Sequence, residues 1–433
     1  MRILWVCNIV LPVIAKELGM PVSNKEGWLS GISRRLLCGM KAEKEIVLGV
    51  CFPVNGVQNG AEEPEGRLSG EPLYYYGFSE DTVHEERYDA ALEQRMKEII
   101  ADFQPDVLHC FGTEYGHTYA AVKAFARPQR TLIGIQGVCA ALAEHYLDGV
   151  PEKAARRRTL RDRLKKDDLL QQQEKMRLRG VRETQALALA GHVTGRTAFD
   201  RREVEKAAPQ AAYHAMNETL RAEFYDGCWR YEDCEKHRLF VSQGNYPIKG
   251  LHDALCALAV LKKQYPDIRL YVGGDCIVRR GSAGWMDRLK ISSYGAYLND
   301  LIREGGLEGQ VCFLGQLSAQ EMKEQYLKAH VFLSASTIEN SPNSVGEAML
   351  LGVPVVSSMV GGVPDLLTDE KEGLFYPAGN ISALAMAVTR MFEDRALAER
   401  LSGAARERAR KTHDADANYR ALLAMYEEIS RCP

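Results

Sequence analysis

Short apolar runs that alternate with longer helical patterns are the feature that most restricts the fold of this 433-residue chain. In its first half such runs occur at residues 2–10, 45–53, 73–78, 106–112, 131–137 and 192–197. Most of these runs are continuously apolar rather than alternating, which is typical of strands buried on both faces of a parallel sheet. Because helical patterns separate the runs, we expect a doubly wound α/β domain.

A second series of the same kind begins after residues 224–238, where the periodicity lapses. Its runs lie at residues 239–244, 269–275, 311–315, 331–336 and 354–358. We therefore expect an N-terminal domain over 1–230, a second Rossmann-like domain over 231–411, and a C-terminal helix in 412–433 that packs back on the first domain. The Gly- and Glu-rich segment 55–72 is expected to be a surface excursion.

Composition narrows the class of protein. A chain that is 46% hydrophobic has enough apolar residues for buried cores, and a net charge of −3 gives no general attraction to nucleic acid. Eleven cysteines without a Cys-x-x-Cys pair indicate reduced thiols in a cytosolic protein. The apolar start is broken by Asn8 and Pro12, which favours a buried strand over a signal peptide, and no run reaches the roughly 18 residues that cross a bilayer.

Residues 151–182 are dense in Arg and Lys within a helical pattern. One interpretation is a solvated helical face of mixed charge. The other is a basic surface that meets anionic lipid or a phosphorylated acceptor, as in a protein that binds the inner face of a membrane peripherally. The sequence does not separate the two.

Residues suited to phosphate follow the first strand of each predicted domain. Gly27 and Gly31 lie near a helix start, where main-chain amides can approach an anion, although any turn of this kind favours glycine. Lys249 and Gly250 stand just before a helix in the second domain, and this lysine is suited to a diphosphate. In two facing Rossmann-like domains, such strand ends are expected to border a shared central cleft.

The segment 336–358 places two carboxylates, Glu339 and Glu347, around a turn between a strand and a helix. For Glu347 a capping box with Ser344 as the N-cap is a sufficient explanation. It does not explain Glu339, which ends a buried strand. Such a carboxylate can accept hydrogen bonds from hydroxyl groups, and a sugar nucleotide carries hydroxyls on both sides of a diphosphate.

With these residues in place, the sequence resembles the retaining family 4 glycosyltransferases with the GT-B fold. The resemblance covers essentially the whole chain and rests on the E-x7-E pair, the lysine of "PIKG", and the segments 346–358 and 361–367. Stretches of the first half resemble members that build bacterial surface polysaccharides. The fold that the resemblance implies is α/β GT-B, two Rossmann-like domains facing a central cleft.

The resemblance also implies roles for individual residues. Glu339 would contact hydroxyls of the transferred sugar, Lys249 would stabilise the departing nucleoside diphosphate, and Glu347 would hold the ribose. Asn343, Ser344 and Val345 would offer groups to the distal phosphate, and residues 313–318 would hold the base. The implied reaction moves a sugar from a nucleotide-sugar donor to a hydroxyl of a glycan or lipid-linked acceptor, without a metal or other cofactor.

This chain departs from the family pattern at several positions. Gln243 and Gly244 stand where members commonly have a Gly-Arg pair, so a second cation on the diphosphate is either missing or comes from elsewhere, with Arg196 as the candidate. Gln136 stands where many members have a histidine. On the acceptor side we expect Glu114, His117 and Gln136. Glu114 and His117 follow the strand at 106–112, although both also suit plain loop positions.

Alternative functions remain open at this point. A sugar-nucleotide epimerase or a phosphorylase would use the same two-domain plan, and a non-catalytic protein could bind a sugar nucleotide without transferring the sugar. The Asp-x-Asp sequence at Asp414 and Asp416, a pattern that can bind metal, precedes the last helix and is interpreted as solvated capping residues.

Overall fold

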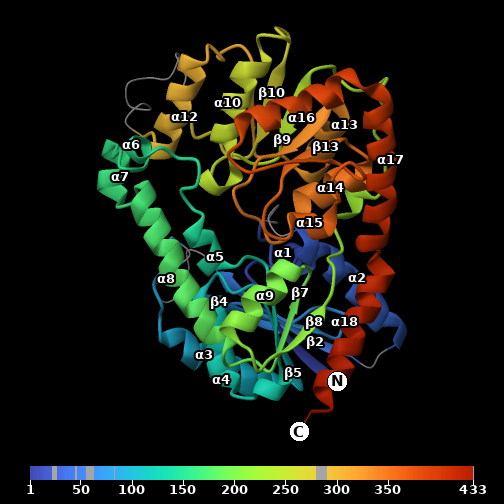
Figure 1. Ribbon diagram of the computed structural model, residues 1–433. Coiled ribbons are helices and arrows are strands. Elements are labelled where there is room, and N and C mark those ends of the chain that lie inside the picture. Colours follow the sequence, from blue (N-terminus) through green and yellow to red (C-terminus); the bar gives the residue numbers. More distant parts are fainter. Residues whose placement is uncertain (22–26, 44–45, 55–62, 82, 279–289, 433) are drawn as a thin grey trace. The chain divides into compact units, whose positions relative to one another are not determined.

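The computed structural model describes residues 1–21, 27–43, 46–54, 63–81, 83–278 and 290–432 (Figure 1). The chain forms two compact units. The first consists of residues 1–141, 175–221 and 413–433, and the second of residues 142–174 and 222–412. Part of the predicted surface excursion, residues 55–62, lies outside the described residues.

The first unit is built on a sheet whose strand order is β3-β4-β2-β1-β5-β6-β7-β8, counting the described strands. All neighbouring strands run parallel except β3, which pairs antiparallel with β4 at one edge. The strands are β1 (Arg2–Val6), β2 (Val47–Val54), β3 (Glu65–Arg67), β4 (Leu73–Ser79), β5 (Val107–Phe111), β6 (Thr131–Gly134), β7 (His192–Gly195) and β8 (Ala212–Ala215).

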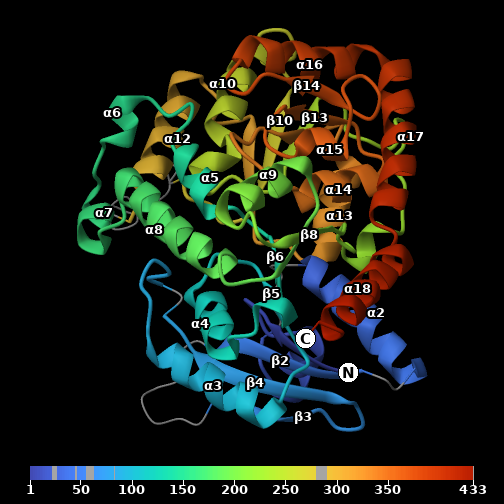
Figure 2. The ribbon, with the colours of Figure 1, turned by 60° about the horizontal axis from the view of Figure 1, so that its bottom comes forward.

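Helices cover both faces of this sheet, as the continuous apolar strands predict (Figure 2). Helices α2 and α18 pack together and share an apolar core with β1, in which Trp5 donates to the hydroxyl of Tyr426 at 2.8 Å. Helices α3 and α4 pack together, and Phe103 of α3 meets the other face of the sheet at Gly49. The elements are α1 (Pro12–Glu17), α2 (Gly27–Glu43), α3 (Ala91–Phe103), α4 (Gly116–Phe125), η1 (Pro128–Arg130), α5 (Cys139–Glu144), α8 (Leu169–Leu187), α9 (Ala198–Ala207) and α18 (Ala415–Ser430).

The second unit carries a fully parallel sheet of order β11-β10-β9-β12-β13-β14 over the described residues, the order of a classical Rossmann sheet. In this order β9 and β12 lie side by side although about ninety residues separate them, so the chain reverses direction between them and their carboxyl ends border the crevice where such folds bind ligands. The strands are β9 (Arg238–Val241), β10 (Arg269–Gly273), β11 (Val311–Gly315), β12 (Val331–Ser334), β13 (Val355–Ser358) and β14 (Leu374–Tyr376).

The helices of the second unit include two long C-terminal ones, α16 and α17, drawn in orange and red in Figure 1. Helix α17 packs on α14, and α16 packs on α10. The elements are α6 (Glu152–Ala155), α7 (Leu160–Lys165), η2 (Ala222–Phe224), η3 (Pro247–Lys249), α10 (Leu251–Leu261), α12 (Ser293–Glu304), α13 (Ala319–Lys328), α14 (Asn343–Leu351), α15 (Val363–Leu366), α16 (Ile381–Glu393) and α17 (Arg395–Thr412).

Each apolar run that the sequence offers as a strand contains one, whereas β3, β8 and β14 are additional short strands. The division into units differs from the contiguous domains expected at 1–230 and 231–411, because residues 142–174 group with the second unit. Helix α6 contacts α12, Asp162 accepts from the main-chain N–H of Ser293 at 2.8 Å, and Arg157 pairs with Asp300 at 2.6 Å. These contacts involve charged residues far apart in sequence, which periodicity does not reveal.

Among the described residues, no helix is both long enough and apolar enough to cross a membrane.

Candidate functional site

Two glycines hold the loop that follows β12 at the carboxyl end of the second sheet. Gly250 and Gly361 adopt φ of +63° and +52°, a region that L-residues with side chains seldom occupy. A Cβ on Gly250 would lie 1.8 Å from the carbonyl oxygen of Ala335, and a Cβ on Gly361 would lie 1.8 Å from that of Glu339. The main-chain N–H of Gly362 also donates to Glu339 at 2.9 Å. Two neighbouring turns therefore fix the main chain on either side of this loop.

Lys249 and Glu339 meet directly at this edge. Lys249 Nζ lies 2.5 Å from Glu339 Oε1, and Ser336 Oγ donates to the same oxygen at 2.7 Å. The side chain of Glu339 is 11% exposed and that of Lys249 is 26% exposed, so the pair is largely shielded but reaches solvent. The sequence places these residues ninety positions apart at the ends of adjacent strands, β9 and β12, and the parallel register explains why they converge.

Glu347 lies on α14 and is buried. The hydroxyl of Tyr326 donates to the main-chain carbonyl of Ser344 at 3.0 Å and lies 3.4 Å from Glu347 Oε2. The capping-box explanation of Glu347 is wrong, because α14 begins at Asn343 with Pro342 as its N-cap, in extended conformation and without a side-chain cap. Ser344 thus lies inside the first turn, and the side chain of Glu347 is held by tertiary contacts instead.

The first turn of α14 presents main-chain amides next to Glu339. Val345 donates its N–H to the carbonyl of Pro342 at 3.0 Å, and its side chain is fully buried. The N–H groups of Asn343 and Ser344 precede the first intrahelical bond, as the leading amides of any helix do, and both residues are partly exposed. Two of the three predicted phosphate-binding residues therefore have amides suited to an anion.

In the first unit, His117 is fully buried at the start of α4. Its Nδ1 lies 2.6 Å from Glu80 Oε2, and its Nε2 lies 3.0 Å from Asn8 Oδ1. Burial opposes ionisation of Glu80, but the charge and the hydrogen bonds of His117 outweigh it and lower the pKa of Glu80. Both ring nitrogens are engaged, so the geometry gives His117 a role in holding Asn8 and Glu80 at the ends of β1 and β4.

Glu114 follows β5 and lies beside the same residues. Gly112 has φ of +90°, and a Cβ there would lie 2.2 Å from Glu114 Oε2 and 2.8 Å from the side-chain nitrogen of Asn8. Burial raises the pKa of Glu114, and among the described residues none donates a hydrogen bond to its Oε2. Glu114 is therefore held in the closely packed turn at Gly112, with one buried carboxyl oxygen that has no donor among the described residues.

Arg196 and Gln136 adjoin each other at the ends of β7 and β6. Arg196 pairs with Glu218 and donates through Nη2 to the carbonyls of Ile135 at 2.8 Å and Gln136 at 3.3 Å. Its side chain is 4% exposed. A guanidinium held by these three partners supports the main chain of Gln136, so the geometry does not favour Arg196 as the second cation on a diphosphate. The four residues border a cavity of about 20 Å³, room for one water.

Gly27 is the first residue of α2, as its predicted position at a helix start requires. A Cβ there would lie 2.3 Å from the Arg221 side chain, and one on Gly31 would lie 2.4 Å from the carbonyl oxygen of Thr219. Close packing of residues 219–221 against α2 is a sufficient reason for glycine at both positions. The two glycines therefore give no separate indication of a phosphate-binding site.

One buried carboxylate near this edge was not predicted. Glu183 of α8 accepts from Thr113 Oγ1 at 2.6 Å and from the main-chain N–H groups of Cys139 and Ala140 at 3.2 and 3.1 Å. Burial raises the pKa of Glu183 to about 7. The residue is hidden in the helical pattern of α8, whereas Asn8 and Glu80 directly follow strands and could have been found by the rule that located Glu114.

The second unit of the chain matches a known protein family. Residues 232–408 match the family model described as glycosyl transferases group 1. Over this segment the chain is similar to the group 1 glycosyl transferases. The match contains Lys249, Glu339, Glu347 and the first turn of α14, so the contacts among these residues lie within the part of the chain that the family model covers.

Curated relatives include glycosyltransferases of bacteria. The chain is 29% identical over 191 residues to the amylovoran biosynthesis glycosyltransferase AmsK of Erwinia amylovora, covering 42% of each protein. It is 32% identical over 143 residues to the putative colanic acid biosynthesis glycosyltransferase WcaL of Escherichia coli, covering 32% of this chain and 31% of WcaL. The matches thus span less than half the length of these relatives.

Solved structures match over almost the whole chain. The sucrose-phosphate synthase of Thermosynechococcus elongatus has a TM-score of 0.67 at 15% identity and covers 99% of each chain. HepE of Anabaena, solved in complex with UDP-glucose, has a TM-score of 0.64 at 16% identity and the same coverage. With two Rossmann-like α/β units and these neighbours, the chain has the GT-B glycosyltransferase fold.

Proposed function

We propose that this protein is a retaining glycosyltransferase that moves a sugar from a nucleoside-diphosphate sugar to a hydroxyl of a glycan or lipid-linked acceptor in the synthesis of a surface polysaccharide. The observation that carries the proposal is the contact of Lys249 with Glu339 beside the first turn of α14, with Glu347 buried on the same helix. The biosynthetic names of AmsK and WcaL and the UDP-glucose complex of HepE support the substrate classes.

In the proposed reaction, the bond between the anomeric carbon and the phosphate oxygen breaks while the acceptor oxygen bonds to the same face of the sugar. Negative charge builds on the diphosphate. Lys249 and the amides of Asn343 and Ser344 would stabilise this charge. The turns at Gly250 and Gly361 hold the main chain at Ala335 and Glu339, in the loop that leads to these amides. A phosphate oxygen would take the proton of the acceptor hydroxyl. Glu339 would then orient the sugar through its hydroxyl groups.

The test is a donor screen. The full-length protein is incubated with UDP-, GDP- and ADP-sugars, and free nucleotide is measured for the wild type and for Glu339→Ala. We expect at least one donor to release nucleotide with the wild type and about 100-fold less with the variant. Equal background release from every donor would mean that the protein does not catalyse transfer. Conversion of a donor to its epimer, or dependence on inorganic phosphate, would replace the proposal with an epimerase or a phosphorylase.

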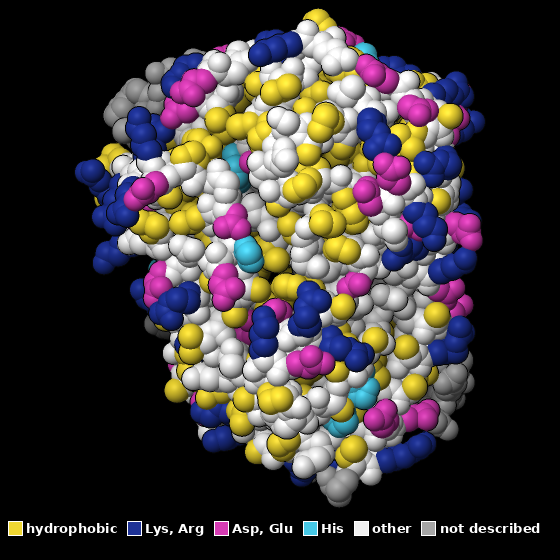
Figure 3. All heavy atoms as spheres, in the orientation of Figure 1, with side chains coloured by type: hydrophobic (Ala, Val, Ile, Leu, Met, Phe, Trp, Pro, Cys, Tyr) yellow, Lys and Arg dark blue, Asp and Glu magenta, His cyan; other side chains and the backbone are white. Residues whose placement is uncertain are grey.

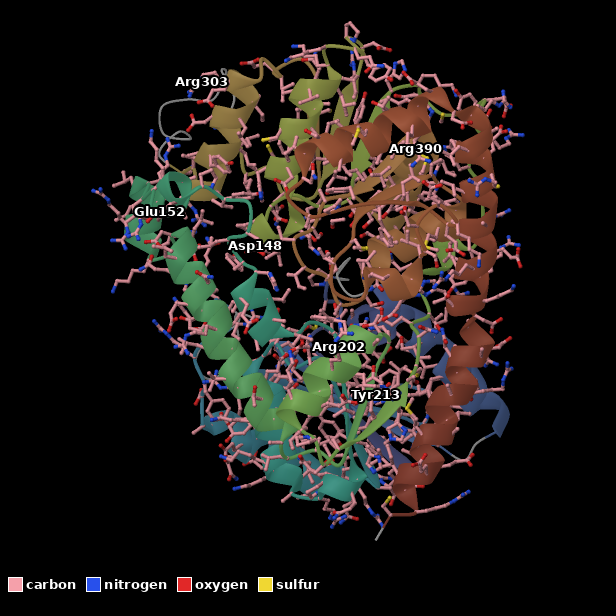
Figure 4. The ribbon with its side chains drawn as sticks, in the orientation of Figure 1. Asp148, Glu152, Arg202, Tyr213, Arg303 and Arg390 are labelled. Atoms are coloured by element: carbon pink, nitrogen blue, oxygen red, sulfur yellow. The ribbon has the colours of Figure 1, made fainter. Side chains whose placement is uncertain are left out.

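We also propose that helix α7 binds the anionic inner face of a membrane. Part of the basic segment 151–182 forms ion pairs within the protein, so fewer of its cations can contact lipid. The side chains that contact carboxylates are Arg156, Arg157, Arg158 and Arg161. Within residues 151–166, no ion pair among the described residues engages Lys153, Arg163, Lys165 or Lys166. Figure 3 shows Lys and Arg side chains gathered over α6 and α7, and Figure 4 labels Glu152 at the start of α6.

Apolar side chains complete this surface. Leu160 and Leu164 lie one turn apart on α7 and are 49% and 78% exposed. A short helix with exposed leucines beside cations is suited to the headgroup boundary of an anionic bilayer. We expect Leu164→Glu to release the protein from anionic vesicles in sedimentation. Met386→Glu, at a 62% exposed methionine of α16, is the control and should stay bound. If both variants bind the vesicles equally, or if the wild type does not bind them, helix α7 is a solvated surface helix and does not bind the membrane.

A further inference from the structure

A cluster of metal-binding side chains lies on the first unit, apart from the residues discussed so far. His192 is the first residue of β7, His214 lies on β8, and Glu428 lies near the end of α18. Among the described residues, these form the one group of three His, Cys, Asp or Glu side chains whose ligand atoms all lie within 4.8 Å of one another. Tyr213, which precedes His214 on β8, is labelled in Figure 4.

The two imidazoles already face each other. His192 Nδ1 lies 2.9 Å from His214 Nε2. Tetrahedral zinc with bonds of 2.0–2.1 Å separates its ligand atoms by about 3.3 Å. The two nitrogens therefore need to move apart by only a few tenths of an ångström to accept an ion, and the carboxylate of Glu428 must approach from an exposed side chain that is free to change rotamer.

The surroundings favour neutral, ligand-competent imidazoles. Burial, reinforced by the neighbouring His214, lowers the pKa of His192, and burial also lowers the pKa of His214. The main chain of Gln129 is hydrogen-bonded to the His192 ring. A second partner of this kind fixes the orientation of a metal-bound histidine in known sites. A hydrogen bond between the two histidines alone would account for their distance but not for the carboxylate that α18 brings to them.

We propose that His192, His214 and Glu428 bind a divalent transition-metal ion of the zinc class and thereby fasten the end of α18 to the edge of the first sheet. Two imidazoles and one carboxylate are ligands typical of zinc, and they leave one position for water. The ligands come from three elements that are distant in sequence, so the ion would stabilise the folded first unit. This proposal is independent of the proposed function, because none of the three residues takes part in the reaction described above.

The experiment compares zinc binding by four forms of the full-length protein: the wild type, Glu428→Gln, His214→Gln and Glu427→Gln. Glu427 is the neighbour of Glu428 on α18 and is also exposed, so its variant makes the same change in charge without removing a ligand. Because Cys38, Cys228, Cys276 and Cys312 are exposed and can take up zinc themselves, the readout is the difference between variants. Zinc chloride is titrated with calorimetric detection, and the melting temperature is recorded with zinc and with a chelator.

We expect the wild type and Glu427→Gln to bind one zinc ion that Glu428→Gln and His214→Gln bind about 100-fold more weakly. Zinc should raise the melting temperature of the first two and not of the last two. Glu428 is exposed, so its variant should fold whatever becomes of His214→Gln. The proposal is overturned if all four bind zinc with the same number and affinity, or if Glu427→Gln loses binding to the same extent as Glu428→Gln.

Discussion

Replacing Gly361 by alanine should disturb the loop that carries Glu339 without changing any group that would touch a substrate. The added Cβ would lie 1.8 Å from the carbonyl oxygen of Glu339, whereas carbon and oxygen normally approach to about 3.3 Å. The loop must therefore shift by about 1.5 Å. The left-handed conformation, φ +52°, lowers the free energy of unfolding by about 1–2 kcal/mol, and the overlap lowers it by about 1–3 kcal/mol more.

Gly379 offers a matched control. It has φ of +75°, but a Cβ there would meet no atom within 4 Å. Gly379→Ala should therefore lose only the 1–2 kcal/mol or so of the left-handed conformation. The difference between the two variants isolates the effect of pressing on the Glu339 loop.

Two measurements follow from this comparison. Urea unfolding should give a larger loss of stability for Gly361→Ala than for Gly379→Ala. Release of nucleotide from the donor should fall about 100-fold in Gly361→Ala, because a displacement of about 1 Å at a reacting centre has effects of that size, and should remain near wild type in Gly379→Ala. If both variants release nucleotide at the same rate, the fixed position of Glu339 is not what the reaction depends on.

Three further predictions concern single residues. Glu347→Gln should weaken binding of the nucleoside diphosphate about 10-fold in calorimetry while the protein stays folded; unchanged affinity would remove Glu347 from the donor site. Burial lowers the pKa of His330 to about 3, and its Nδ1 accepts the main-chain N–H of His237 at 3.2 Å, so the ring stays neutral in the folded protein. Below pH 6.5 the unfolded chain binds a proton at this residue that the folded chain does not. The contribution of His330 to the free energy of unfolding should therefore fall by roughly 1.4 kcal/mol per pH unit. Urea unfolding at pH 7 and 5 should show a smaller fall in His330→Gln, and an equal fall would contradict the assignment. Glu80→Gln should lower stability by about 1–3 kcal/mol, because it leaves the buried His117 without its carboxylate, and a neutral outcome would refute that coupling.

Much of the fold follows from the sequence because its strands are buried on both faces and appear as unbroken apolar runs. The short strands β3, β8 and β14 escape this signal because all three lie at sheet edges. Both β3 and β8 are partly exposed and lack an unbroken apolar run, and β14 has only three residues. The excursion of residues 142–174 into the second unit depends on Arg157 and Asp162 finding partners on α12, and charged surface contacts between distant segments leave no periodic trace.

The candidate site was partly predictable for a related reason. The sequence alone shows that Lys249 and Glu339 each follow a strand. Because parallel strands end at the same edge of a sheet, both residues could be placed at that edge without knowing the strand order. The side-chain partners were not predictable. Ser344 appeared to be an N-cap because Ser344 and Glu347 have the spacing of a capping box, whereas the helix begins one residue earlier. Arg196 appeared available because its partner, Glu218, lies in a segment without regular pattern.

The central claim is that Lys249 and the first turn of α14 bind a diphosphate, and affinity for a nucleoside diphosphate tests it most directly. UDP, GDP and ADP are titrated into the wild type, Lys249→Ala and the exposed-lysine control Lys263→Ala. We predict that at least one nucleotide binds the wild type and the control alike, and binds Lys249→Ala about 10-fold or more weakly, because the variant loses the cation and leaves Glu339 facing the phosphates. The same affinity in all three proteins, or binding of no nucleotide, would contradict the account.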